Sequence, residues 1–264
     1  MTFNSKTFDP NQGLLLDKET TSLCRMEVRE KENLRWMVSE DGVLHGAITL
    51  KDPSLPLLPY VRSMLIAQIL KPEATKVLNL GLGCGAIERY IASTHPHVKL
   101  TTVEISQTRL EQTKRFFHLR PGSNSSIFVQ DASNFMSRKI PEQDIIYCDL
   151  FDVRSNYNTI FSNDFVFRLW EKLSKNGLIA INYVLEDQKK LINTLVILRK
   201  IFAVTAMIDI EDHANIVILA FKTDRPRIEL IKSYINKLDC TYDLDFAKTL
   251  ESIEWLPRPP NTLI

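Results

Sequence analysis

The chain has 264 residues, 44% of them hydrophobic and 25% charged, so it is a globular protein rather than a disordered chain, a collagen-like repeat or a coiled coil. Its 33 basic and 32 acidic residues leave a formal charge of +1, so no overall field draws the molecule to nucleic acid or anionic lipid. We therefore expect no nucleic-acid partner and no membrane partner.

The four cysteines, Cys24, Cys84, Cys148 and Cys240, stand far apart and form no CxxC pair. They predict neither a disulfide framework nor a zinc site, and we expect no metal. No apolar stretch is long enough to cross a membrane, and the first residues lack the basic and apolar regions of a secretory signal. The expected location is the cytoplasm.

Residues 1–58 are predicted to form a small N-terminal β domain. Apolar or alternating segments at 14–16, 24–29 and 34–38 favour short antiparallel strands, with Asp41-Gly42 supplying a turn. From Tyr60 the apolar period becomes helical, and Pro72 stops it.

Residues 59–222 alternate between strand and helix patterns. The strand candidates are 76–80, 100–104, 126–130, 144–149 and 178–183, followed by a closing pair at 203–208 and 215–221. The helix candidates are 86–94, 107–117, 132–136, 163–173 and 188–201. This order predicts an α/β fold with a doubly wound, mostly parallel sheet and an antiparallel edge. Residues 223–264 are predicted to form one helix and a tail.

Three of the eight glycines, Gly81, Gly83 and Gly85, follow an apolar strand and precede a predicted helix. Glycine there permits a tight turn and lets a ligand lie against bare backbone, close to the free N–H groups of the helix start. The alternative is a tight turn without a ligand. No lysine follows the glycines, which excludes a P-loop NTPase.

Two acidic residues end the next two strands. Glu104 is placed to accept the two hydroxyls of a ribose, or else is a solvated strand end. Asp131, followed by Ala132, is placed to meet the exocyclic amine of an adenine or to cap the next helix, and both roles can hold at once. Together with the glycines, these acids indicate an adenosine-containing cofactor.

The glycine segment and the VEI segment (103–105) resemble class I S-adenosylmethionine-dependent methyltransferases. Taken together, seven segments resemble the spermidine synthase (polyamine aminopropyltransferase) family more closely, over about residues 20–222. They are LHGA (44–47), LPY (58–60), GLGCG (81–85), VEI (103–105), DIIYCDLFD (144–152), FSNDF (161–165) and LSKNG (173–177). The resemblance implies a seven-stranded methyltransferase-like sandwich behind a small β domain, and a homodimer.

The resemblance also implies an activity, the transfer of an aminopropyl group from decarboxylated S-adenosylmethionine to a small-molecule amine. Asp149 and Asp152 match the acids of the family's DxxDP motif. Because a polyamine is an ammonium ion at neutral pH, a carboxylate can attract it, orient it and take its proton. The alternative for both acids is an ordinary strand-end or loop role. Tyr60 either lines the acceptor site or is a buried tyrosine at a helix start.

The residues expected to bind the nucleoside follow from the same segments. They are Gly81, Gly83, Cys84, Gly85, Glu104, Ile105, Asp131 and Ala132.

The chain departs from the family pattern at three places. Cys84 stands where the family's GGGDGG motif carries an acid that would pair with the ammonium group of the decarboxylated donor. Val153 replaces the proline that follows the second acid of DxxDP. Arg62 follows Tyr60 by two residues, where the family has polar and acidic residues. A cationic Arg62 facing the pocket would repel a polyamine. Three functions therefore stay open: aminopropyl transfer, methyl transfer from intact S-adenosylmethionine to a small molecule, and nucleoside binding without catalysis.

Overall fold

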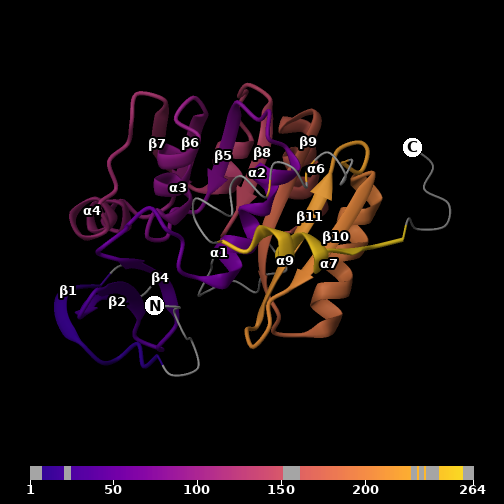
Figure 1. Ribbon diagram of the computed structural model, residues 1–264. Coiled ribbons are helices and arrows are strands. Elements are labelled where there is room, and N and C mark those ends of the chain that lie inside the picture. The colour runs from indigo at the N-terminus through magenta and orange to yellow at the C-terminus, as the bar shows by residue number, and fades with distance from the viewer. Residues whose placement is uncertain are drawn as a thin grey trace.

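The computed structural model describes residues 8–20, 25–150, 161–226, 231, 235 and 244–257. They form two sheets that lie side by side, with helices on both faces of the larger one (Figure 1). No helix among these residues has the length and apolar character needed to cross a membrane.

The smaller sheet is antiparallel and its strands pair in chain order. The strands are β1 (Leu14–Thr20), β2 (Arg25–Lys31), β3 (Leu34–Ser39) and β4 (Leu44–Thr49). The apolar pattern predicts only the first three. The fourth strand is not predicted, because Gly46 and Ala47 have low strand propensity, although both are buried here.

The larger sheet has eight strands in the order β12-β10-β11-β9-β8-β5-β6-β7. They are β5 (Lys76–Leu80), β6 (Lys99–Glu104), β7 (Ser125–Val129), β8 (Gln143–Cys148), β9 (Leu173–Val184), β10 (Val204–Asp209), β11 (Asn215–Phe221) and β12 (Glu254–Trp255). Strands β5 to β9 are parallel, and β11 runs antiparallel to both β9 and β10, which confirms the predicted sheet and its edge.

Two details of this sheet differ from the prediction of seven strands. The eighth strand, β12, is only two residues long and pairs with β10 next to Ala206. Strand β9 begins at Leu173 rather than 178, because its first residue already pairs with Gln143 across an irregularity in register.

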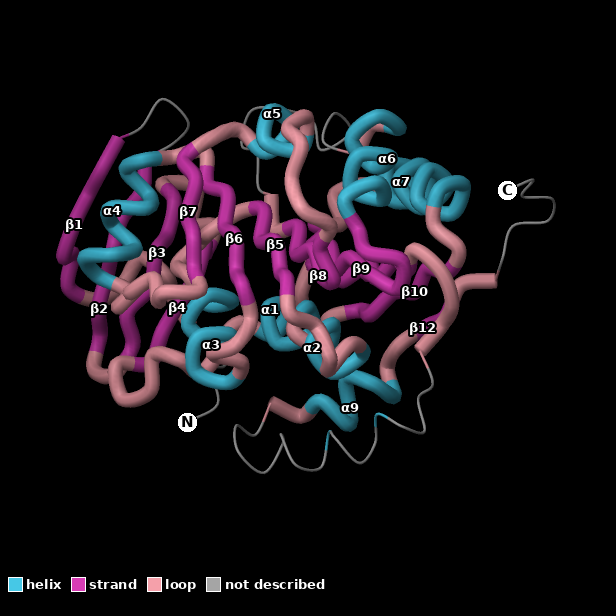
Figure 2. The backbone as a smooth tube through the Cα atoms, turned by 90° about the horizontal axis from the view of Figure 1, so that it is seen from above, coloured by secondary structure: helices cyan, strands magenta, loops and turns pink. Residues whose placement is uncertain are grey.

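The described helices cover both faces of this sheet. They are α1 (Pro59–Met64), α2 (Ile66–Leu70), α3 (Ala86–Thr94), α4 (Gln107–Phe116), α5 (Ala132–Met136), α6 (Asn163–Lys172), α7 (Gln188–Ile201) and α9 (Phe246–Glu251). Figure 2 shows α1, α2, α3 and α9 on one face and α5, α6 and α7 on the other. Alternate residues of the strands feed two separate apolar cores, with Val77 in one and Leu78 in the other.

The small sheet packs against the large one near the glycine turn. Met37 and Ile48 share an apolar cluster with Cys84 and Phe117. The Gln112 side chain of α4 donates a 2.8 Å hydrogen bond to Asp17 on β1. The division of the chain near residue 58 stays a prediction, and the two parts share buried apolar side chains across it.

Candidate active site

The turn between β5 and α3 is built on left-handed backbone. Gly81, Gly83 and Gly85 have φ of +98°, +54° and +73°, a region that favours glycine. A Cβ at Gly81 would lie 2.1 Å from the backbone oxygen of Asp149, so only glycine fits where the turn crosses the end of β8. The structure therefore brings the glycine turn and Asp149 into direct contact.

Cys84 lies inside this turn with its thiol in an apolar environment. Its Sγ would stand 2.3 Å from a Cβ on Gly46, so the small sheet packs directly on it. Burial raises the pKa of the Cys84 thiol to about 12, although the charges of Arg89 and Arg109 act in the opposite direction. The thiol is thus neutral at physiological pH, and it supplies no negative charge to the turn.

Arg89 holds the same turn from the side of α3. Its Nη1 donates to the backbone oxygens of Cys84 and Phe117, and its Nε donates to that of Pro53 at 2.6 Å. Arg62 likewise donates from Nε to the oxygen of Pro56 at 2.7 Å. Both arginines bind backbone carbonyls, and neither is among the residues that line the cavity described below.

Glu104 ends β6 as predicted and is almost wholly buried. Its two carboxylate oxygens accept hydrogen bonds from the backbone N–H of Leu82, at 3.1 Å, and of Ser106, at 2.9 Å. Each oxygen keeps a second lone pair, so the carboxylate can still accept ribose hydroxyls. Beside it, Ile105 is 52% exposed and offers an apolar surface for a base.

Asp131 caps α5. Its Oδ1 accepts a 2.9 Å hydrogen bond from the backbone N–H of Asn134, and the next residue, Ala132, is buried. The predicted capping role is confirmed, whereas contact with an adenine stays a prediction.

Asp149 follows β8 and is held by side chains from other parts of the chain. Its Oδ1 accepts a 2.7 Å hydrogen bond from Asn182 Nδ2 on β9, and its Oδ2 accepts a long one, 3.5 Å, from the Tyr60 hydroxyl at the start of α1. Asn182 is fixed in turn by Asn215 on β11, whose Nδ2 donates at 2.8 Å. Neither asparagine is among the predicted site residues, and the signal that could have found them is a polar residue on a largely apolar strand.

The ionisation of this pair is set by burial. Burial raises the pKa of Asp149 above its ordinary value, against the hydrogen bonds from Asn182 and Tyr60 and the positive charge of Arg109. Burial, and next the negative charge of Asp149, raise the pKa of Tyr60, which stays protonated and can donate. A carboxyl with a raised pKa is suited to taking a proton and giving it up near neutral pH.

A small cavity of about 20 Å³ lies between β4, α1 and the glycine turn, and Tyr60 and Asp149 both line it. Tyr60 therefore fits both interpretations, since it is a partly buried tyrosine at a helix start and also faces the cavity. His45 lines it too, and burial together with the charge of Arg109 lowers the pKa of His45 to about 3, so that it is neutral. The volume is that of a single water molecule, so an amine enters only if side chains move.

Arg109 acts on the site through its charge, although it is not among the residues that line the cavity, and no local sequence pattern predicts this role. It stands in the first turn of α4, where its backbone N–H donates to the capping Ser106 Oγ at 3.1 Å. Its Nε is buried and has no hydrogen-bond partner among the described residues. Its positive charge acts on four groups that line the cavity, namely His45, Tyr60, Cys84 and Asp149.

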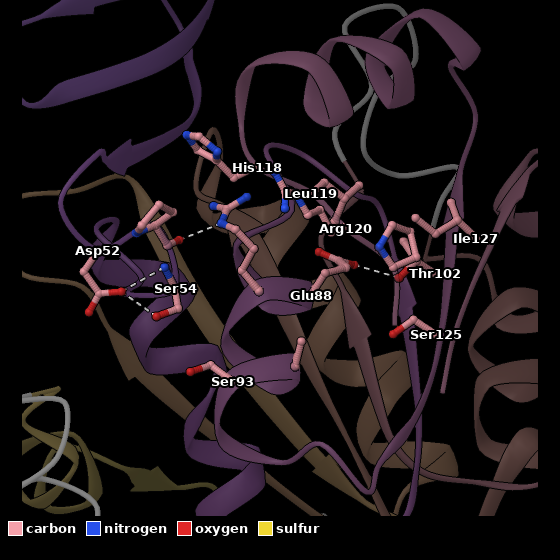
Figure 3. Close-up of a pocket in the computed structure, with 14 residues that line it drawn as sticks. Asp52, Ser54, Glu88, Ser93, Thr102, His118, Leu119, Arg120, Ser125 and Ile127 are labelled. Carbon is pink, nitrogen blue, oxygen red and sulfur yellow. Dashed lines mark hydrogen bonds between the residues drawn. The ribbon is translucent and has the colours of Figure 1, made fainter. Parts of the chain in front are cut away.

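A separate cavity of about 370 Å³ lies between α3, the 52–54 segment and strands β6 and β7 (Figure 3). Figure 3 shows Glu88 turned toward Thr102, whose hydroxyl donates to Glu88 Oε1 at 2.7 Å. Asn79 donates to the same oxygen at 2.7 Å. None of the predicted site residues lines this cavity, so volume alone does not identify the candidate site.

Asp152 lies outside the described residues. Within those residues, no group of three or more His, Cys, Asp or Glu side chains is placed to hold a metal ion.

Comparison with known proteins identifies the family and the fold. The family model of the spermine/spermidine synthase domain matches residues 62–210, more than half of the chain. The polyamine aminopropyltransferase of Neisseria meningitidis serogroup A is 24% identical over 235 residues, which cover 86% of this chain and 88% of that protein.

Two solved structures have the same fold. The crystal structure of a probable spermidine synthase from Corynebacterium glutamicum matches with a TM-score of 0.73 and 16% identity, covering 94% of this chain and 91% of the other. Human methyltransferase-like protein 13 in complex with SAH matches with a TM-score of 0.55 and 18% identity, covering 78% and 93%. These matches confirm the predicted methyltransferase-like α/β fold with its small antiparallel sheet.

Proposed function

Because the chain belongs to the spermine/spermidine synthase family, we propose that it transfers an aminopropyl group from decarboxylated S-adenosylmethionine to a small amine. The observation that carries this proposal is the placement of Asp149. Asp149 lines the cavity beside the glycine turn, and its carboxyl group is held by Asn182 and Tyr60. A group in that place can receive a proton from an amine bound in the cavity.

In the proposed transfer, Asp149 is the group of this chain that accepts the proton released by the substrate amine. The substrate amine arrives as an ammonium ion, and Asp149 takes one proton from it, which frees a nitrogen lone pair. That nitrogen attacks the methylene carbon next to the sulfonium, the C–N bond forms as the C–S bond breaks, and the electron pair moves to sulfur to give methylthioadenosine. Alignment of the two substrates supplies most of the rate enhancement.

The donor nucleoside would bind at the edge of the sheet where the carboxyl ends of the parallel strands meet. The adenosine would lie over Gly81–Gly85, with its ribose hydroxyls on the free lone pairs of Glu104 and its base between Ile105 and Asp131-Ala132. Three features support this arrangement: the bare backbone of the turn, the remaining acceptor capacity of Glu104 and the exposed apolar side chain of Ile105.

Methyl transfer from intact S-adenosylmethionine is the second candidate, and one observation favours it. The neutral thiol of Cys84 offers no negative charge to the ammonium of a decarboxylated donor. The third alternative, nucleoside binding without catalysis, predicts ligand affinity without turnover.

The test is a turnover assay on the purified chain. The protein is incubated with decarboxylated S-adenosylmethionine and a series of diamines, and released methylthioadenosine is quantified. In parallel, intact S-adenosylmethionine is supplied and S-adenosylhomocysteine is quantified. Methylthioadenosine release that requires an amine supports the proposal, S-adenosylhomocysteine formation supports the second candidate, and neither product overturns both.

We also propose that the chain forms a homodimer through its small sheet. Strand β1 is an edge of that sheet, and its Leu14 and Leu15 are 67% and 42% exposed. An exposed apolar edge strand is a surface that natural proteins usually cover. Sedimentation velocity at micromolar concentration tests this proposal, and a monomer would contradict it.

A further inference from the structure

The small cavity has a titratable carboxyl group on one side and neutral side chains on the other. Asp149 supplies a carboxyl group at one side, whereas Cys84 and His45 are neutral because both are buried. The cation that acts on all three groups is Arg109. Arg109 therefore adds a positive charge to this region, and the carboxylate of Glu104, which also acts on Asp149, adds a negative one.

Arg109 differs from the two neighbouring arginines in its bonding. Arg62 and Arg89 donate to backbone carbonyls. The side chain of Arg109 makes no hydrogen bond and no ion pair with any described residue, and its Nε is buried. A guanidinium nitrogen removed from water without a partner costs free energy, which an incoming anion would recover.

Glu104, the acid that ends β6, does not serve as that anion. Glu104 directs one oxygen to the backbone N–H of Leu82 and the other to that of Ser106, and no ion pair joins it to Arg109. Through these two bonds Glu104 accepts from the backbone of the glycine turn and from the residue that caps α4. Arg109 follows Glu104 by five residues and stands in the first turn of α4, whose capping Ser106 donates its backbone N–H to Glu104.

We propose that Arg109 forms a subsite for the carboxylate of a substrate bound at the glycine turn. The planar fork of a guanidinium pairs with a carboxylate through two parallel hydrogen bonds, which gives both affinity and orientation. The inference rests on the proposed function, because it takes the cavity to be the site of group transfer. A carboxylate on the acceptor keeps aminopropyl transfer, whereas a carboxylate on the donor changes the group that is transferred.

The carboxylate has two sources with the same chemistry. It belongs either to the donor, as intact S-adenosylmethionine, or to an acceptor that carries an amine and a carboxylate. In the first case the same attack on the methylene next to sulfur moves an amino-carboxypropyl group, again with the C–S electron pair passing to sulfur and the proton to Asp149. In the second case an aminopropyl group moves to an amino acid-like amine.

The experiment compares matched ligands by calorimetric titration of the full chain. Methylthioadenosine, which has no carboxylate, reports on the adenosine site alone. Intact and decarboxylated S-adenosylmethionine form the donor pair, and 4-aminobutanoate and 1,4-diaminobutane, titrated in the presence of methylthioadenosine, form the acceptor pair. The variants are Arg109→Gln and Arg109→Lys, with Arg168→Gln as the control, because Arg168 pairs with Asp164 on α6 and does not line the cavity.

For the wild type we expect the carboxylate-bearing member of one pair to bind about tenfold tighter than its partner. Arg109→Gln should remove that preference and leave methylthioadenosine affinity unchanged. Arg109→Lys should keep part of the preference, and Arg168→Gln should keep all of it.

Two results would overturn the inference, and they are distinguishable. Unchanged preferences in both pairs after Arg109→Gln, with methylthioadenosine still bound, would remove the carboxylate subsite and leave the proposed function standing. Absence of methylthioadenosine binding by the wild type would remove the proposed adenosine site and the subsite with it.

Discussion

The two ends of the small cavity are built in different ways. At the glycine end the chain presents left-handed backbone, with Gly81 against the end of β8, Gly83 against β4 and Gly85 against side chains that include Leu119. At the Asp149 end it presents side chains, contributed by α1, β8, β9 and β11. The glycine end depends on local sequence and steric fit, whereas the Asp149 end exists only because distant strands become neighbours.

The glycine end therefore determines the shape of the backbone, and the Asp149 end determines which groups can take part in proton transfer. A substitution at the glycine end should act first on folding, since the backbone there has no room for a side chain. A substitution at the Asp149 end should act first on turnover, since the strands that carry these side chains are held by their own ladders. Four predictions test this division, beginning with the largest effect.

Asp149→Asn should lower turnover by at least about 100-fold, because the amide cannot take the proton of the bound amine. Donor affinity should change little. Since the pKa of Asp149 is raised, the wild-type rate should fall on the acid side at a pH above that of an ordinary aspartate, as the carboxylate becomes protonated. Steady-state rates across a pH series measure both effects.

The control for this variant is Asp144→Asn on the same strand. Asp144 lies at the opposite end of β8, where it accepts hydrogen bonds from the Thr75 backbone at 2.9 Å and from Ser174 at 2.9 Å. That variant should lose stability and keep its turnover per folded molecule. Equal losses of turnover in both variants would contradict the role of Asp149.

Gly81→Ala should destabilise the fold by about 3 kcal/mol, because it combines left-handed strain with a backbone clash. Gly42→Ala isolates the strain, since Gly42 has φ +80° and an added Cβ there would meet no atom within 4 Å. It should cost only about 1 kcal/mol. Urea denaturation of both variants checks the difference, and equal costs would show that the contact with Asp149 is unimportant.

Gly46→Ala should cost about 2 kcal/mol, because its new methyl group meets the thiol of Cys84. Since Gly46 has ordinary backbone angles, this clash is the expected cause. Adding Cys84→Ala removes the sulfur but keeps the Cβ of residue 84, which would lie 2.7 Å from the new methyl group, so it should recover only about 1 kcal/mol of that loss in a double-mutant cycle. Additive costs would mean that the sulfur of Cys84 is not the atom that opposes the new methyl group.

His45 should make the stability fall in mild acid. Its folded pKa of about 3 lies below the value of 6.5 expected when unfolded, so only the unfolded chain takes up this proton between those values. The unfolding free energy should therefore fall by about 1.4 kcal/mol per pH unit from this group as the pH drops below 6.5. In urea denaturation across that pH range, His45→Gln should reduce the slope by this amount, and the exposed His97 changed to Gln should not. His95 and His118, whose pKa burial also lowers, keep their own contributions to the slope.

Local sequence patterns are enough to locate the strand and helix alternation of residues 76–221. The glycine turn, Glu104 and the capping Asp131 were also predictable, because each depends on a strand end or helix start that local periodicity locates. Family resemblance added Asp149 and Tyr60. The strand β4 was missed, since its small buried residues carry no strand propensity and gain their burial from the glycine turn.

The side chains that surround Asp149 and the charge of the cavity follow instead from tertiary packing. Asn182, Asn215 and Arg109 stand on three elements that no local pattern relates. Asn182 meets Asp149, and Asn215 meets Asn182, because the sheet order places β9 next to β8 and β11 next to β9. The neutrality of Cys84 and His45 is likewise a product of burial against the small sheet. Periodicity fixes where an element begins and which face is apolar, whereas hydrogen bonding and desolvation depend on neighbours that only folding supplies.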